Sequence, residues 1–138
     1  MGQTYTSVLA VDDDPILLQI LTAFFARCGI TNVMTANNGV EATRLVVEHD
    51  GIDLIISDLH MPGADGIEFL DYLKGIGCRV PLVIVSSADK STMMAAGVLA
   101  TAYQLNFLGS LSKPIDFNKM TSLLSPGLFN ADCCITRR

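Results

Sequence analysis

The sequence predicts an α/β fold in which a parallel β-sheet carries helices on both faces. Short apolar runs, bounded by turn residues, alternate with amphipathic stretches along the chain. Strict alternation of strands and helices is typical of parallel sheets, because each crossover helix covers a face of the sheet. The chain has 138 residues, of which 50% are hydrophobic, so it is long enough to form one domain with a substantial core.

In the first half of the chain, turn residues mark the ends of the expected elements. Val8–Val11 is a short apolar run and predicts the first strand. Asp14 is a good N-cap and Pro15 suits the first helical position, and Gly29 ends the helix that they begin. The turn sequence Asn37–Gly39 starts a second helix. We therefore expect strands over 8–11, 32–36 and 53–57, and helices over 15–28 and 39–49.

Glycine and proline also divide the second half of the chain. A loop rich in both ends at Gly66, and Ile67, Leu70 and Leu73 then recur at helical spacing before Gly75. A stretch rich in methionine and alanine predicts a longer helix further on. We therefore expect helices over 67–75, 89–105 and 116–124, and strands over 80–85 and 107–111.

Composition and charge narrow the range of functions. The net charge of −5 argues against nucleic acid as a direct partner. No apolar run is long enough to span a bilayer, and the polar start of the chain lacks the features of a secretory signal, so we expect a cytoplasmic protein that does not bind membranes. The composition changes only near residue 125. We therefore expect one domain over residues 1–125 and a tail over 126–138, which could begin a linker to an output domain.

Charged and hydroxyl side chains follow four of the five expected strands. Asp12 and Asp13 come after the first strand and Asp58 after the third, while Ser86 and Lys113 follow the fourth and fifth. Right-handed crossovers bring the carboxyl ends of parallel strands to one edge of the sheet, so we expect these side chains to converge there. Clustered carboxylates repel one another, and oxygen ligands with few or no histidine or cysteine partners suit Mg²⁺. The sequence therefore predicts a magnesium site at this edge.

The same residues suit phosphoryl transfer to a carboxylate. A carboxylate beside Mg²⁺ stays ionised and can act as a nucleophile toward phosphorus. Mg²⁺ and the Lys113 ammonium would neutralise charge on the phosphoryl oxygens, and the Ser86 hydroxyl would bind another of these oxygens. Each residue alone also has a structural explanation, such as helix capping for Asp14. Their combination is what predicts the function.

These motifs together resemble a known family. Val-Asp-Asp-Asp-Pro from residue 11, Ser-Asp-Leu-His-Met-Pro-Gly-Ala-Asp-Gly from residue 57, Val-Ser-Ser-Ala from residue 85 and Ser-Lys-Pro from residue 112 follow one another along the chain. Their order is similar to that in the receiver domain of two-component response regulators, over about residues 7–124. The resemblance implies a doubly wound, flavodoxin-like sheet of five strands in the order 2-1-3-4-5.

The resemblance also implies the chemistry of the site. Asp58 would be the phosphoacceptor, and a histidine kinase or phosphotransfer protein would be the partner that donates the phosphoryl group. Asp12 and Asp13 would hold Mg²⁺ together with Asp58, and the backbone carbonyl of His60 would complete the protein's ligands. Such a domain is a signalling module rather than an enzyme with turnover on a diffusible substrate.

Ser86 and Lys113 would convert phosphorylation into a signal. The resemblance makes Ser86 the switch hydroxyl and Lys113 the phosphate-binding lysine. Phosphorylation would turn Ser86 inward and reshape the face formed by the segments 89–105, 107–111 and 116–124. An output domain or a second copy of the chain would bind on this face.

Two departures from the family pattern fall on this face. Ser110 stands three residues before Lys113, where the family often has tyrosine or phenylalanine. The stretch from Ser86 to Lys113 is also several residues longer than usual. The extra length falls in the helix of this stretch or in the loop that follows it. We therefore expect an atypical signalling surface, with an enlarged helix as one form of it.

Two other functions stay open on the sequence alone. A receiver that is no longer phosphorylated would act as a protein-binding module. Asp12 and Asp14 after a strand also resemble the nucleophile motif of haloacid-dehalogenase-type phosphatases, although Pro15 makes Asp14 a helix cap and no later acidic pair completes a metal site. The nucleophile distinguishes the two chemistries, because it is Asp58 in a receiver and Asp12 in a phosphatase.

Overall fold

A computed structural model of the chain describes residues 5–59 and 66–124. The predicted tail over 126–138 lies outside these ranges, so the predicted domain boundary stays a prediction. The described residues alternate strands and helices throughout, as the sequence predicts. The strands are β1 (Ser7–Val11), β2 (Asn32–Ala36), β3 (Leu54–Ser57), β4 (Leu82–Ser86) and β5 (Phe107–Ser112), and the helices are α1 (Pro15–Arg27), α2 (Gly39–Glu48), α3 (Gly66–Gly75), α4 (Lys90–Ala102) and α5 (Phe117–Leu124).

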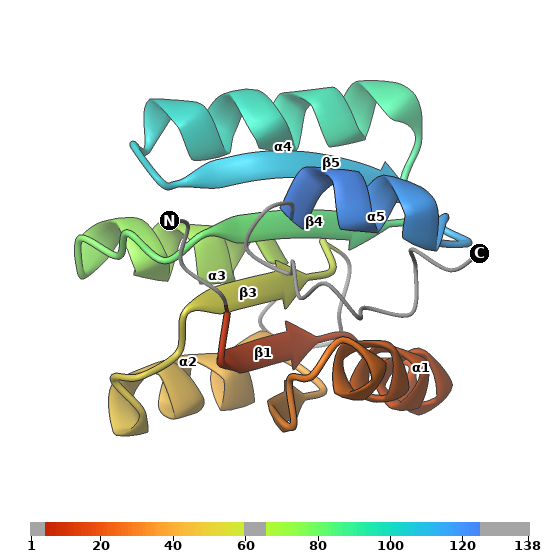
Figure 1. Cartoon of the computed structure of the whole chain (residues 1–138). Helices are drawn as coiled ribbons and strands as arrows, with labels where there is room; N and C mark the ends of the chain where they lie inside the picture. The colour runs from red at the N-terminus through yellow and green to blue at the C-terminus, as the bar shows by residue number, and fades with distance from the viewer. Residues whose placement is uncertain (1–4, 60–65, 125–138) are drawn as a thin grey trace.

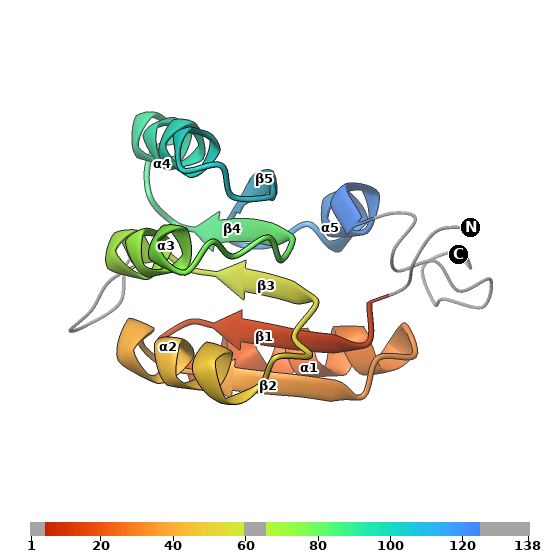
Figure 2. The ribbon, with the colours of Figure 1, turned by 90° about the vertical axis from the view of Figure 1, so that its left-hand side faces the viewer.

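The strands form one parallel sheet in the order β2-β1-β3-β4-β5, which confirms the predicted order. Figure 1 shows β1, β3, β4 and β5 in this order, and Figure 2 shows β2 next to β1. β3 lies at the centre and all four of its residues are buried. β5 lies at one edge of the sheet, next to β4. Because all strands run in the same direction, the carboxyl ends of β1, β3, β4 and β5 meet at one edge of the sheet.

Helices cover both faces of the sheet (Figure 2). The core on one face is formed with α1 and α5, and the core on the other face with α2, α3 and α4. Neighbouring strand residues point to opposite faces, so Ile56 packs in the first core and Ile55 in the second. The rings of Phe24 and Phe117, with centroids 4.8 Å apart, join α1 to α5. Among the described helices, none is long and apolar enough to cross a membrane.

The turn into α1 follows the predicted capping pattern. The side chain of Asp14 accepts a hydrogen bond from the backbone N–H of Ile16 at 3.0 Å, and Pro15 occupies the first turn. Beyond the helix, Gly29 has a φ of 89°, a left-handed conformation that favours glycine. Asp14 is therefore a cap, which leaves Asp12 and Asp13 for other interactions at the edge of the sheet.

α4 ends earlier than the sequence predicts. It begins after Asp89, whose side chain accepts a hydrogen bond from the N–H of Thr92 at 2.8 Å. It ends at Ala102 after 13 residues, the same length as α1. Gln104 has a φ of 63°, and this left-handed conformation takes the chain out of the helix. α4 is therefore shorter than the predicted range 89–105, while its enlargement relative to the family stays a prediction.

Candidate functional site

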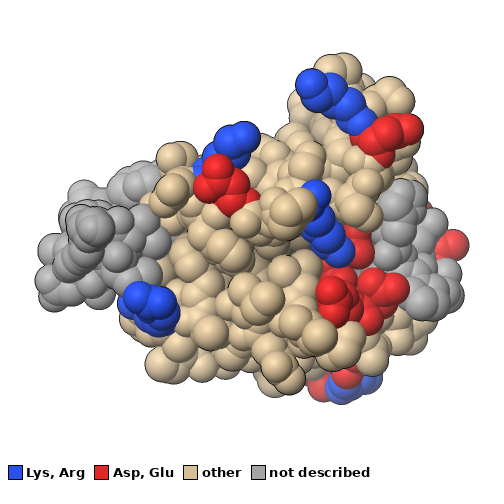
Figure 3. All heavy atoms as spheres, turned by 90° about the vertical axis from the view of Figure 1, so that its right-hand side faces the viewer, with Lys and Arg blue, Asp and Glu red and all other residues tan. Residues whose placement is uncertain are grey.

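Side chains from four strand ends converge at the carboxyl edge of the sheet, as predicted. Figure 3 shows this edge, where acidic side chains gather around a basic one. The sixth predicted residue, His60, lies outside the described residues. The predicted residues that the structure places at the edge are Asp12, Asp13, Asp58, Ser86 and Lys113.

Lys113 binds two buried carboxylates at once. Its Nζ lies 2.7 Å from Oδ2 of Asp12 and 3.2 Å from Oδ2 of Asp58. The side chains of Asp12 and Asp58 are 1% and 5% exposed, whereas that of Lys113 is 22% exposed. Lys113, which directly follows the edge strand β5, therefore contacts carboxylates at the ends of β1 and β3, on the far side of β4.

Backbone hydrogen bonds hold the other oxygen of each buried carboxylate. The N–H of Asp14 donates to Oδ1 of Asp12 at 2.9 Å, and the N–H of Leu59 donates to Oδ1 of Asp58 at 2.7 Å. The backbone N–H of Asp58 also donates to the carbonyl of Val11 at 2.9 Å. Each carboxylate therefore has one oxygen bound to the backbone and the other turned toward Lys113.

The carboxylates fit a divalent cation with oxygen ligands. Asp12, Asp13 and Asp58 each offer one oxygen atom, and these atoms lie within 4.8 Å of one another. Oδ2 of Asp12 is buried, and the Lys113 ammonium lies beside it. Asp13 is exposed and opens the cluster to solvent. Hard oxygen ligands with an open side suit Mg²⁺, which keeps several of its waters.

Burial and charge act against each other on the ionisable groups here. Burial raises the pKa of the Asp12 carboxyl, although Lys113 and the hydrogen bond from Asp14 oppose this shift. Burial also lowers the pKa of the Lys113 ammonium, but the hydrogen bonds and charges of Asp12 and Asp58 outweigh it and leave that pKa raised. The metal-free site therefore keeps Lys113 protonated, while the negative charge on Asp12 remains unfavourable.

The raised pKa of Asp12 predicts that removing this carboxylate changes the stability of the protein in a pH-dependent way. The folded protein binds the Asp12 proton more tightly than the unfolded chain, where the pKa of this carboxyl is near 3.8. The bound proton therefore stabilises the folded protein at low pH, and this stabilisation is lost as the pH rises through the folded pKa. In EDTA, we expect Asp12→Asn to gain stability over the wild type across this pH range. Urea unfolding between pH 4 and 8 measures the difference.

Asp13→Asn is the matched control for this prediction, because Asp13 is adjacent but exposed. It should change the stability less than Asp12→Asn does. A wild type that gains stability over Asp12→Asn as the pH rises would contradict the predicted sign.

Ser86 connects the ends of β4 and β5. The residue is fully buried, and its Oγ accepts a hydrogen bond from the backbone N–H of Ala88 at 3.1 Å. Its carbonyl accepts a hydrogen bond from the backbone N–H of Lys113 at 3.0 Å. The hydroxyl and the lysine are therefore held at neighbouring strand ends.

The structure adds one polar group that the sequence analysis missed. Ser57 is 1% exposed, and its hydroxyl donates to the backbone carbonyl of Asp58 at 3.0 Å. A small polar residue at the end of an otherwise aliphatic strand was the only signal in the sequence.

The sequence is similar to those of known proteins that belong to one family. Residues 8–125 match the response regulator receiver domain family. The chain belongs to this family. This receiver domain is 37% identical over 92 residues to the two-component response regulator ORR22 of Oryza sativa subsp. indica, which covers 66% of the chain and 13% of that protein. It is 34% identical over 119 residues to a response regulatory protein of Staphylococcus epidermidis, covering 85% of the chain and 44% of that protein. The chain thus spans less than half the length of these curated relatives.

Solved receiver structures are also similar. A response regulator from Colwellia psychrerythraea has a TM-score of 0.75 and 28% identity, over 88% of this chain and 94% of that one. The receiver domain of the Francisella response regulator 1452 has a TM-score of 0.70 and 27% identity, over 83% and 89% of the two chains. The family assignment confirms the resemblance found in the sequence, and it gives no support to the phosphatase interpretation with Asp12 as nucleophile.

Proposed function

We propose that this receiver domain accepts a phosphoryl group on Asp58 from a histidine kinase or phosphotransfer protein. The observation that carries the proposal is the position of Lys113 Nζ, 3.2 Å from Oδ2 of Asp58 within a cluster of three carboxylates. A carboxylate oxygen of Asp58 would form the bond to phosphorus while the bond from phosphorus to the donor nitrogen breaks. Asp12, Asp13 and Asp58 would hold Mg²⁺, with the carbonyl of His60 as a further predicted ligand.

The residues of the chain would act on the phosphoryl oxygens. Mg²⁺, when bound, neutralises part of their charge. The ammonium of Lys113 is already beside Asp58 and would bind a second oxygen. The Ser86 hydroxyl would bind another after its hydrogen bond from the N–H of Ala88 breaks.

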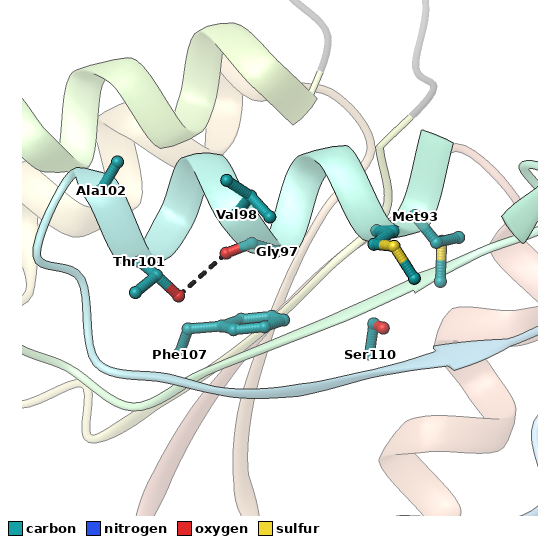
Figure 4. A pocket seen from close by; sticks show the side chains of 8 residues that line it. Met93, Gly97, Val98, Thr101, Ala102, Phe107 and Ser110 are labelled. Carbon is teal, nitrogen blue, oxygen red and sulfur yellow. Dashed lines mark hydrogen bonds between the residues drawn. The ribbon is translucent and has the colours of Figure 1, made fainter. Parts of the chain in front are cut away.

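We further propose that this change is read on the face of α4, β5 and α5. An apolar groove of 550 Å³ lies between α4 and β5 (Figure 4), and a second of 490 Å³ lies between β5 and α5. Ser110 lines both grooves. The family often has an aromatic ring at this position, and the small serine side chain leaves the two grooves next to each other. Met94 and Val98 of α4 are 67% and 65% exposed beside the first groove. An output domain or a second copy of the chain would bind on this face.

The test is the intact mass of the protein after incubation with Mg²⁺ and acetyl phosphate. We expect one added phosphoryl group on the wild type, and none on Asp58→Asn or in EDTA. Asp14→Asn is the matched control, because asparagine keeps the helix cap beside the site and should leave phosphorylation intact.

The other outcomes distinguish the remaining interpretations. No adduct on the wild type, together with no stabilisation by beryllium fluoride and Mg²⁺, would indicate an unphosphorylated binding module. An adduct that persists in Asp58→Asn and disappears in Asp12→Asn would place the nucleophile at Asp12.

A further inference from the structure

One peptide unit beside the phosphoacceptor is held at both of its ends. The peptide bond between Asp58 and Leu59 is planar, so its carbonyl and its N–H turn together. Its carbonyl oxygen accepts a hydrogen bond from the Ser57 hydroxyl at 3.0 Å. Its N–H donates to Oδ1 of Asp58 at 2.7 Å. The Ser57 hydroxyl is therefore connected to the Asp58 carboxylate through a single rigid group.

Close packing encloses the same carbonyl group. Ser57 is 1% exposed, so water does not replace its hydroxyl as a donor. The Cα of Gly66 lies against the carbonyl, and a Cβ at this position would overlap the Asp58 carbonyl oxygen. The N–H of Gly66 also donates to the carbonyl of Leu59 at 2.9 Å. The peptide unit cannot turn without losing hydrogen bonds on both of its sides.

The orientation of this peptide unit determines the direction in which the Asp58 carboxylate points. With Oδ1 accepting from Leu59, Oδ2 faces the Lys113 ammonium at 3.2 Å. We propose that Ser57 is a positioning residue for phosphoryl transfer, because its hydroxyl fixes the peptide unit that orients the Asp58 carboxylate. The proposal rests on Asp58 being the phosphoacceptor. The Ser57 hydroxyl donates to a backbone carbonyl, so its effect is on orientation.

The test compares Ser57→Ala with Ser57→Thr, which retains the hydroxyl. For each variant, the phosphorylation rate is measured by intact mass at several acetyl phosphate concentrations in saturating Mg²⁺. We expect Ser57→Ala to lower the maximal rate about 2- to 12-fold, the range that loss of one hydrogen bond implies, without raising the half-saturating phosphodonor concentration. Ser57→Thr should stay within about twofold of the wild type.

A second measurement separates orientation from a general loss of stability. The amide proton of Leu59 in an ¹H–¹⁵N spectrum reports its hydrogen bond to Oδ1 of Asp58. We expect an upfield shift in Ser57→Ala but not in Ser57→Thr. Thr22→Val is the matched control, because it also removes a hydroxyl-to-carbonyl hydrogen bond, of 2.8 Å to Leu18, but on α1. If Ser57→Ala does not fold, Ser57→Cys keeps the side chain's shape with a weaker donor and should show the same changes.

Three results would count against the proposal. In the first, Ser57→Ala is phosphorylated at the wild-type rate with an unchanged Leu59 amide, and only this proposal fails. In the second, the wild type accepts no phosphoryl group at all, and the proposed function fails with it. A rate loss of equal size in Thr22→Val would also assign the effect to stability and count against Ser57.

Discussion

Lys113→Ala is expected to destabilise the metal-free protein more than any other single change at the site. The variant leaves the Asp12 carboxylate, whose side chain is 1% exposed, without its cation, and removes the ammonium beside Asp58. Breaking a buried ion pair from one side costs about 3–5 kcal/mol, and the partial exposure of Lys113 reduces this to about 2–4 kcal/mol. Urea unfolding at pH 7 in EDTA measures the loss.

Magnesium should restore much of the stability that Lys113→Ala loses. A cation bound by Asp12, Asp13 and Asp58 would supply the positive charge that the variant lacks, so Mg²⁺ should stabilise Lys113→Ala more than the wild type. Lys119→Ala is the matched control, since Lys119 is exposed on α5, and it should change neither stability nor the response to Mg²⁺. Equal stabilisation of Lys113→Ala and wild type by Mg²⁺ would contradict the prediction that the ion replaces the positive charge of Lys113.

Gly66→Ala is expected to disrupt the site by steric overlap. A Cβ at Gly66 would overlap the Asp58 carbonyl oxygen and lie 2.6 Å from Cα of Leu59. Both neighbours are backbone atoms next to the phosphoacceptor, so they cannot move without displacing it. Overpacking of this kind costs about 1–3 kcal/mol. We expect a lower melting temperature together with slower phosphorylation by acetyl phosphate.

Gly75→Ala is the matched control for this prediction, because it lies at the other end of α3 with nothing within 4 Å of the added Cβ. Alanine there should be neutral or stabilise the protein by up to about 1 kcal/mol, since it favours the helix more than glycine does. Destabilisation of equal size in both variants would contradict overlap at Gly66 as the cause.

The fold and the convergence of the site could be predicted because they depend on regular patterns. The apolar runs before Asp12 and Asp58 are buried strands, and parallel topology alone brings the two carboxylates to the same edge. Asp14 and Pro15 marked the start of α1 because capping is local in sequence. Strand order does not follow from such local patterns, and it came from the resemblance to receiver domains.

Tertiary contacts explain what the sequence did not predict. Ile67 recurs at helical spacing with Leu70 and Leu73, but it is 38% exposed and Phe69 is buried instead. Gln104 ends α4 in a left-handed conformation that single-sequence reasoning expects of glycine. The role of Ser57 depends on a contact with its neighbour's carbonyl, which no residue pattern encodes.

The opposite edge of the sheet offers sites for modification. The strand starts and helix ends meet there, in the turns around Gly51, Gly77 and Gln104. Surface turns tolerate insertions when their backbone is exposed, as at Gly51, where an added Cβ would meet nothing within 4 Å. A fluorophore or affinity handle at Gly51 would therefore sit on the side of the domain away from Asp58. Such a label would allow a binding partner to be titrated without altering the chemistry that regulates it.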